Sequence, residues 1–143
     1  MLSTLQTRRA ASEMFRFLQV GAVGYIINIV VFYSLRHIHV TIAPALIVAF
    51  GCAATLTWAL NRRYTFGTRP RAKPVGQWLR FLSANAVGAL IYVGAFALFT
   101  HSAKIFSTFP ALTILLSAGV AFVSNFVLSS RLVFASALST EQS

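Results

Sequence analysis

The motif Arg16-Phe17-Leu18, followed by Ala22-Val23-Gly24, returns 64 residues later as Arg80-Phe81-Leu82, followed by Ala86-Val87-Gly88. The match keeps both the residue types and their spacing, so it extends over about two helical turns. A sequence that repeats in this way predicts two copies of one structural unit rather than one irregular domain.

The second part of the repeat is shifted. Arg63-Tyr64-Thr65-Phe66 is matched by Arg131-Leu132-Val133-Phe134 at an offset of 68, so four extra residues enter the second copy between Thr100 and Asn125. We therefore place the two repeats at residues 16–66 and 80–134.

The composition indicates a membrane protein. Hydrophobic residues make up 57% of the 143 residues and charged residues 10%, whereas about a quarter of a soluble domain is charged. Four stretches without a charge are long enough for a helix to cross about 30 Å of hydrocarbon. These predicted spans are residues 17–35, 40–61, 81–100 and 105–130. The predicted fold is an all-α integral membrane domain over residues 16–134, with a basic segment at 1–15 and a polar tail at 135–143.

The positive charges predict how the chain crosses the membrane. Ten cations lie before the first span, between the second and third, or after the fourth, and two, Arg36 and Lys104, lie at the other ends. By the positive-inside rule both termini are cytoplasmic. Both repeats then enter from the same side, so we expect them to be parallel, in a cytoplasmic (inner) membrane.

Small residues recur every four positions in the second and fourth spans. The corresponding sets are Ala49, Ala53, Thr57, Asn61 and Ser117, Ala121, Asn125, Ser129. One interpretation is a packing seam that lets helices approach closely. The other is a polar path that becomes more polar towards the cytoplasm and ends at an arginine of each repeat.

Two further amides, Asn28 and Asn85, lie within the first and third spans. An amide in hydrocarbon needs a partner, so both are expected to face the interior, either in interhelical hydrogen bonds or along the same path.

Arginines and aromatic residues gather at the predicted cytoplasmic boundary. The guanidinium fork matches the oxygens of a phosphate, and aromatic rings anchor at the interface or stack on a sugar. The alternative for the arginines is that they only set the topology. The candidate phosphate-binding residues are Arg63, Arg62, Arg131, Arg16 and Arg80, and the candidate aromatic contacts are Trp58, Tyr64 and Trp78.

The acids are too few for most enzyme chemistry. The chain has two carboxylates, neither within a predicted span, and one cysteine, Cys52. We therefore expect no enzyme activity, no metal site, no cofactor and no carboxylate-dependent proton coupling. The distribution of charge in short loops also argues against nucleic acid as a partner.

These residues resemble the GtrA-like family of small four-span membrane proteins. The resemblance rests on Arg16-Phe17-Leu18 with Val20-Gly21, on Asn61-Arg62-Arg63-Tyr64-Thr65-Phe66, and on Asn125-Phe126 with Arg131-Leu132-Val133-Phe134. It implies a role in cell-surface polysaccharide synthesis, in which polyprenyl-phosphate-linked sugars cross the cytoplasmic membrane. Asn28 lies where the resemblance implies a polar or acidic residue, and because it is a neutral amide no acid-dependent step carries over to this chain. The second ending, Ser129-Ser130-Arg131, has one cation where the resemblance implies asparagine-arginine-arginine.

The first hypothesis is therefore a lipid-linked sugar translocase whose phosphate site centres on Arg63. The alternatives are a membrane anchor that recruits a glycosyltransferase, and a small multidrug-type exporter. Expected partners are the polyprenyl-phosphate sugar, anionic phospholipids and a second copy of the chain, since four helices are few to enclose a head group.

Overall fold

Four long helices contain most of each predicted charge-free stretch. The computed structural model describes residues 2–69, 72–102, 104 and 108–134, and the predicted tail at 135–143 lies outside them. Within this part the secondary structure is all helical. The elements are α1 (Leu2–His37), α2 (Ile42–Leu60), η1 (Asn61–Thr65), α3 (Pro74–Ser102), α5 (Pro110–Leu128) and η2 (Ser129–Val133). Four of these helices are long and apolar enough to cross a membrane, which is the number of spans predicted, at Arg8–His37, Ile42–Thr65, Pro74–Ser102 and Leu112–Val133.

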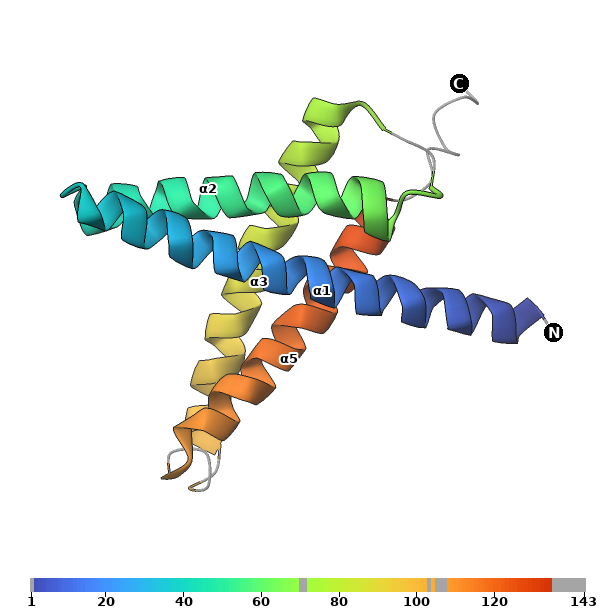
Figure 1. The fold of residues 1–143 in the computed structure, drawn as a ribbon. Helices are drawn as coiled ribbons and strands as arrows, with labels where there is room; N and C mark the ends of the chain where they lie inside the picture. The colour runs from blue at the N-terminus through green and yellow to red at the C-terminus, as the bar shows by residue number, and fades with distance from the viewer. Residues whose placement is uncertain (1, 70–71, 103, 105–107, 135–143) are drawn as a thin grey trace. The chain divides into compact units, whose positions relative to one another are not determined.

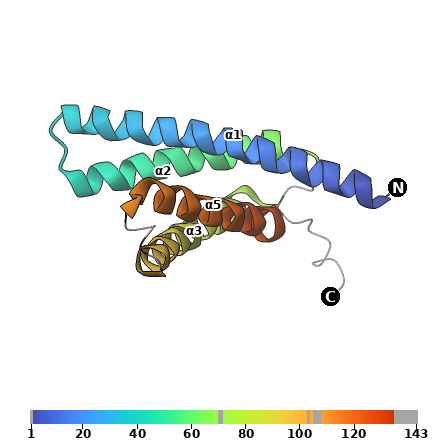
Figure 2. The ribbon, with the colours of Figure 1, turned by 90° about the horizontal axis from the view of Figure 1, so that it is seen from below.

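The chain divides into two compact units, Met1–Arg69 and Pro70–Ser143. In the first unit α1 packs against α2 and η1, and the two long helices run side by side in opposite directions (Figures 1 and 2). In the second unit α3 packs in the same way against α5 and η2. Each unit is thus a helical hairpin.

A tight turn joins α1 to α2. The Val40 N–H donates to the Leu35 carbonyl at 3.0 Å, and the His39 N–H donates to the Arg36 carbonyl at 3.1 Å. His39 adopts a left-handed conformation with φ 64°. This arrangement, which closes the end of a helix with one left-handed residue, usually has glycine there. The Arg36 guanidinium also donates to the Val40 carbonyl at 2.7 Å.

The basic segment predicted at residues 1–15 is helical and continuous with the first span. Helix α1 has 36 residues, which at 1.5 Å per residue is about 54 Å. A span needs about 20 residues, so α1 extends beyond the hydrocarbon at its N-terminal end. This extension brings Glu13 and Arg9 to the end of the first hairpin.

Proline marks the helix starts. Pro74 and Pro110 are the first residues of α3 and α5, and Pro44 lies in the first turn of α2; proline is tolerated there because those N–H groups have no partner within the helix. Ile42 and Pro110, which begin α2 and α5, are 68 residues apart, while α1 ends at His37 and α3 at Ser102. Four residues separate α1 from α2 and seven separate α3 from α5, so three of the four extra residues of the second repeat lie between α3 and α5, within the predicted interval.

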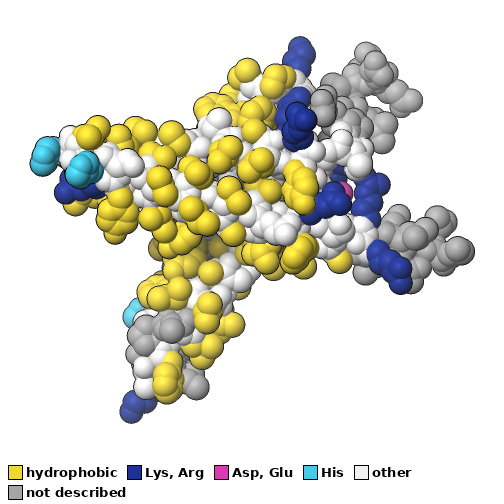
Figure 3. Space-filling view, in the orientation of Figure 1, with side chains coloured by type: hydrophobic (Ala, Val, Ile, Leu, Met, Phe, Trp, Pro, Cys, Tyr) yellow, Lys and Arg dark blue, Asp and Glu magenta, His cyan; other side chains and the backbone are white. Residues whose placement is uncertain are grey.

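Most large apolar side chains point outward. Tyr25, Ile47, Leu90 and Leu115 are 70%, 71%, 73% and 69% exposed, and Figure 3 shows hydrophobic side chains covering the length of the helices. Soluble proteins rarely expose such continuous apolar surface. With a hydrocarbon-spanning length, this surface is the one that faces lipid.

Candidate headgroup-binding site at the ends of the helix hairpins

Each hairpin ends in a π-helical turn that carries the arginine motif. The Phe66 N–H donates to the Asn61 carbonyl and the Phe134 N–H donates to the Ser129 carbonyl, each at 2.8 Å. These bonds span five residues rather than four. Such wide turns are rare and are often found at functional sites. The sequence repeat does not reveal them, because a widened turn leaves no distinct pattern of residue types.

A buried aromatic pair holds each π turn against the preceding long helix. The rings of Phe17 and Phe66 have centroids 6.2 Å apart, and those of Phe81 and Phe134 are 6.1 Å apart. All four side chains are buried. The two pairs occupy corresponding positions in the repeat, so the same contact fixes the end of both hairpins. Pairs with this separation stabilise a fold beyond their buried area.

The stripe of small residues forms the seam within each hairpin. Ala49, Ala53, Thr57 and Asn61 are all buried in the first unit. A Cβ atom placed on Gly24 would overlap the Thr57 methyl group. Glycine therefore lets α1 and α2 approach closely, which is the packing role that one interpretation predicts.

The second hairpin uses the corresponding positions. Ser117, Ala121 and Ser129 are buried, and Asn125 is half-buried. A Cβ atom on Gly88 would overlap the side-chain amide of Asn125. The glycine and its facing residue thus recur at equivalent places, with asparagine in the second unit where the first has threonine.

The hydroxyl groups along the first seam have hydrogen-bond acceptors within the same hairpin. The Thr57 hydroxyl lies 2.9 Å from the Ala53 carbonyl and 3.1 Å from the Ala54 carbonyl. The Thr65 hydroxyl donates to Asn61 Oδ1 at 2.7 Å. A buried polar group costs free energy unless it is bonded, so both hydroxyls are satisfied within this hairpin. On the same helix, the buried Trp58 Nε1 has no hydrogen-bond partner among the described residues.

The second seam differs. Asn125 Oδ1 and Ser129 Oγ are buried and have no hydrogen-bond partner among the described residues. The counterpart of Thr65 is Val133, which carries no hydroxyl. Each such orphaned group costs about 1–3 kcal/mol.

The two remaining amides of the predicted path lie elsewhere. The Asn85 amide donates to the Phe81 carbonyl of its own helix at 2.8 Å. Asn28 is half-buried on α1. Thus four of the six predicted path residues lie in the seams, namely Thr57, Asn61, Asn125 and Ser129.

Two of the predicted phosphate-binding arginines lie over aromatic rings of the same unit. The Arg16 guanidinium lies 5.4 Å from the centre of the Tyr64 ring and donates to the Tyr64 carbonyl at 3.4 Å. Arg62 lies over Trp58 at 5.6 Å. Arginine stacks on aromatic faces in this way at a gain of about 0.5–1 kcal/mol when exposed. The predicted aromatic sites Tyr64 and Trp58 therefore contact arginines of their own unit, while Trp78 is half-buried on α3.

Three predicted arginines remain uncommitted. Arg63, Arg80 and Arg131 are exposed, and the structure gives their side chains no ion pair, hydrogen bond or ring contact with another described residue. Arg63 lies on η1, Arg131 on η2, and Arg80 on α3 next to the buried Phe81. These are the guanidinium groups available to an external anion.

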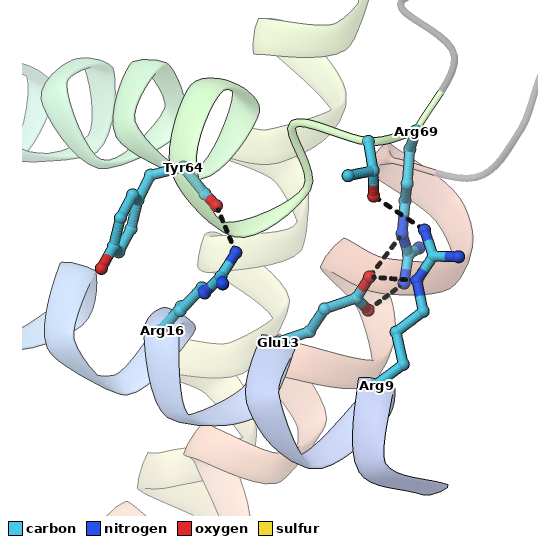
Figure 4. Close-up of polar contacts among 6 residues, drawn as sticks. Arg9, Glu13, Arg16, Tyr64 and Arg69 are labelled. Carbon is cyan, nitrogen blue, oxygen red and sulfur yellow. Dashed lines mark hydrogen bonds and ion pairs between the residues drawn. The ribbon is translucent and has the colours of Figure 1, made fainter. Parts of the chain in front are cut away.

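A buried carboxylate organises the end of the first hairpin. Glu13, on α1, is 7% exposed and forms ion pairs with Arg69 and with Arg9, the latter at 3.5 Å. Figure 4 shows the Arg9 and Arg69 side chains converging on Glu13. Arg69 also lies over the Phe66 ring at 4.6 Å, and Arg9 donates to Thr68 Oγ1 at 2.7 Å.

Glu13 and Arg9 have the i, i+4 spacing of neighbours on one helix, whereas Arg69 lies 56 residues from Glu13 in the sequence. The repeat does indicate that this position on the long helix is structurally important. Glu13 corresponds to Gln77, which is also buried and donates to the Val133 carbonyl at 3.2 Å. The shared position ties the long helix to the turn that ends each hairpin.

The comparison with known families agrees with these observations. The chain matches the family described as GtrA/DPMS, transmembrane domain, over residues 16–134, and it belongs to that family. Membership suggests involvement in the handling of polyprenyl-phosphate sugars. A search of curated proteins finds no match to this chain.

Proposed function

We propose that the protein moves a polyprenyl-phosphate-linked sugar across the cytoplasmic membrane for polysaccharide synthesis. The observation that carries the proposal is the set of uncommitted guanidinium groups at the ends of two apolar hairpins. A polyprenyl phosphate combines a long apolar tail with a phosphate. The exposed apolar helices suit the tail, and Arg63 and Arg131 on the π turns suit the phosphate.

The proposal includes an orientation and an assembly state. Both termini and the arginine ends face the cytoplasm, where the sugar lipid is loaded, and the two repeats are parallel. Two copies of the chain enclose the head group, and the apolar tail stays in the bilayer. The protein itself performs no chemistry on the lipid, and transport runs downhill as the sugar is consumed outside.

A direct test uses purified protein in liposomes with NBD-labelled farnesyl-phosphate glucose. Dithionite added outside reduces only the outer-leaflet probe, so protein-free liposomes keep the inner half fluorescent. With wild-type protein we expect all of the fluorescence to be lost. The double variant Arg63→Gln/Arg131→Gln is expected to move the probe at least about tenfold more slowly, because charge-assisted phosphate contacts are lost.

The matched control is Lys104→Gln, which removes one positive charge outside the arginine-bearing ends and should leave the rate unchanged. Failure of the wild-type protein to move the probe, with normal surface glycosylation in cells carrying the double variant, would defeat the translocase proposal. The glycosyltransferase anchor would then be the better account.

A further inference from the structure

We infer that the two hairpins have different roles, and that the second hairpin is the one that binds the sugar-phosphate head group. This inference rests on the proposed function and names the half of the protein that holds the ligand. It reverses the expectation from the sequence, where Asn61-Arg62-Arg63 in the first repeat is the richer motif. The internal duplication supplies the control, because each position in one hairpin has a counterpart in the other.

The first step compares Arg16 with Arg80. The Arg16 guanidinium lies over the ring of Tyr64 and donates a hydrogen bond to the Tyr64 carbonyl. The residue that corresponds to Tyr64 is Leu132, which offers no aromatic face. Arg80 is accordingly exposed and without a described partner. The loss of one ring therefore frees one guanidinium in the second hairpin.

The second step places Arg80 beside the turn that carries Arg131. One helical turn earlier, Gln77 donates to the Val133 carbonyl at 3.2 Å. Immediately after Arg80, the Phe81 ring contacts that of Phe134. The two contacts hold this stretch of α3 against η2, so two free guanidinium groups flank one helix end. A phosphate can accept from both, whereas in the first hairpin Arg63 stands without its partner Arg16.

The third step concerns the orphaned polar atoms. Asn125 Oδ1 and Ser129 Oγ are buried and have no hydrogen-bond partner within residues 72–102 and 108–134 or elsewhere in the described chain, and Ser129 is 1% exposed. Their counterparts Thr57 and Asn61 are bonded within the first seam. An amide oxygen accepts and a serine hydroxyl both accepts and donates, which is the complement of a sugar hydroxyl.

The spacing fits a sugar phosphate. Asn125 and Ser129 lie one helical turn apart on the same face, and Arg131 follows two residues later. The distance along the helix from Asn125 to Arg131 is about 9 Å. Ligand entry parts this end of the α3–α5 seam, and the unmet hydrogen bonds lower the cost of doing so.

The first test measures the binding of farnesyl-phosphate glucose to detergent-purified protein by calorimetry. Arg80→Gln is expected to weaken binding about tenfold, since it removes a charge-assisted contact. Arg16→Gln is expected to weaken it less and to lower the melting temperature more, because Arg16 supports its own helix end. Arg8→Gln, an exposed cation on α1, controls for the loss of one charge.

Two outcomes overturn the inference at this stage. One is that Arg16→Gln weakens binding as much as Arg80→Gln. The other is that phosphatidylglycerol or inorganic phosphate competes as well as the sugar lipid, because the site would then recognise phosphate alone. Wild-type protein that binds the probe in the expected pattern but does not move it in liposomes would keep the inference and defeat the translocase.

The second test introduces into the second hairpin the asparagine and threonine that are hydrogen-bonded to each other in the first. Ser129→Asn/Val133→Thr recreates Asn61 and Thr65, and should raise the melting temperature while weakening farnesyl-phosphate glucose severalfold. Binding of farnesyl phosphate, which has no sugar, should stay unchanged. Should the double variant fail to fold, Ser129→Ala removes the hydroxyl without adding volume and should weaken the sugar lipid alone. Unchanged sugar-lipid binding in the folded variant overturns the assignment.

Discussion

At the residue scale, one side chain decides whether an arginine is structural or available. Arg16 and Arg80 occupy the same position in the repeat, yet Tyr64 holds the first and Leu132 cannot hold the second. The difference is chemical, because a guanidinium group stacks on an aromatic face and gains little from leucine. Counting arginines along the sequence therefore overstates the number that a ligand can reach.

The closest approach within the second hairpin depends on Gly88. We expect Gly88→Ala to destabilise the protein by about 1–3 kcal/mol, because its Cβ atom would overlap the Asn125 amide and force the helices apart. Chemical or thermal unfolding in detergent measures this loss. Gly94→Ala on the same helix is the matched control, since its Cβ atom meets nothing within 4 Å. Its expected effect is within about 0.5 kcal/mol, and equal effects of the two variants would contradict the seam.

At the element scale, the π turns decide where each hairpin ends. Both turns bury a phenylalanine against the preceding long helix and leave an arginine outside. A regular α-helix would place each side chain of the motif about 100° further round the axis for every residue. A π turn contains one residue more than an α-helical turn, so it changes the directions in which the side chains point. The buried ring and the exposed guanidinium can therefore occur three residues apart.

The turn between α1 and α2 offers a test of local strain. His39 is left-handed with φ 64°, a conformation that costs a non-glycine residue about 1–2 kcal/mol. Glycine relieves this cost but adds disorder to the unfolded chain, so His39→Gly should stabilise the protein by about 0.5–1 kcal/mol. His39→Val should lower the melting temperature, because β-branched residues tolerate this region least. A lower melting temperature for His39→Gly than for wild type would refute the account.

At the scale of the whole molecule, the charges set the direction of the chain in the membrane. Ten of the twelve cations lie at one set of ends by sequence, and in the first unit Arg9, Arg16 and Arg62 gather at the end opposite the α1–α2 turn. Translocation of positively charged segments is disfavoured, so we propose that these ends lie in the cytoplasm. In this proposed orientation the exposed arginines also face the cytoplasm.

Single cysteines test this orientation. In a Cys52→Ser background, Lys104→Cys should react with a membrane-impermeant maleimide in intact cells, whereas Lys73→Cys should react only after the cells are opened. The reason is that Lys73 precedes the third span in the arginine-rich linker, and Lys104 follows that span. Labelling of Lys73→Cys in intact cells would reverse the assigned topology.

Much of the fold can be predicted because it depends on local composition. Charge-free stretches of 19 residues or more have one stable solution in hydrocarbon, a helix that bonds its own backbone, and the structure has four helices that meet this requirement. The repeated small residues lie in the seam of each hairpin, and the prolines mark the helix starts. Helix limits are less predictable, because α1 continues through the basic residues before the first span.

The sequence by itself determined that this is a membrane protein with four helices of spanning length, since length and hydropathy decide spanning, and its arginine-containing motifs indicated the GtrA-like family. Only the tertiary structure decided which polar groups are used up within the protein. Glu13 meets Arg69 across 56 residues, Tyr64 contacts Arg16, and Asn125 Oδ1 and Ser129 Oγ find no hydrogen-bond partner in the described part of the chain. Hydrogen bonds and ion pairs act over about 3–4 Å, so they depend on which residues folding brings together.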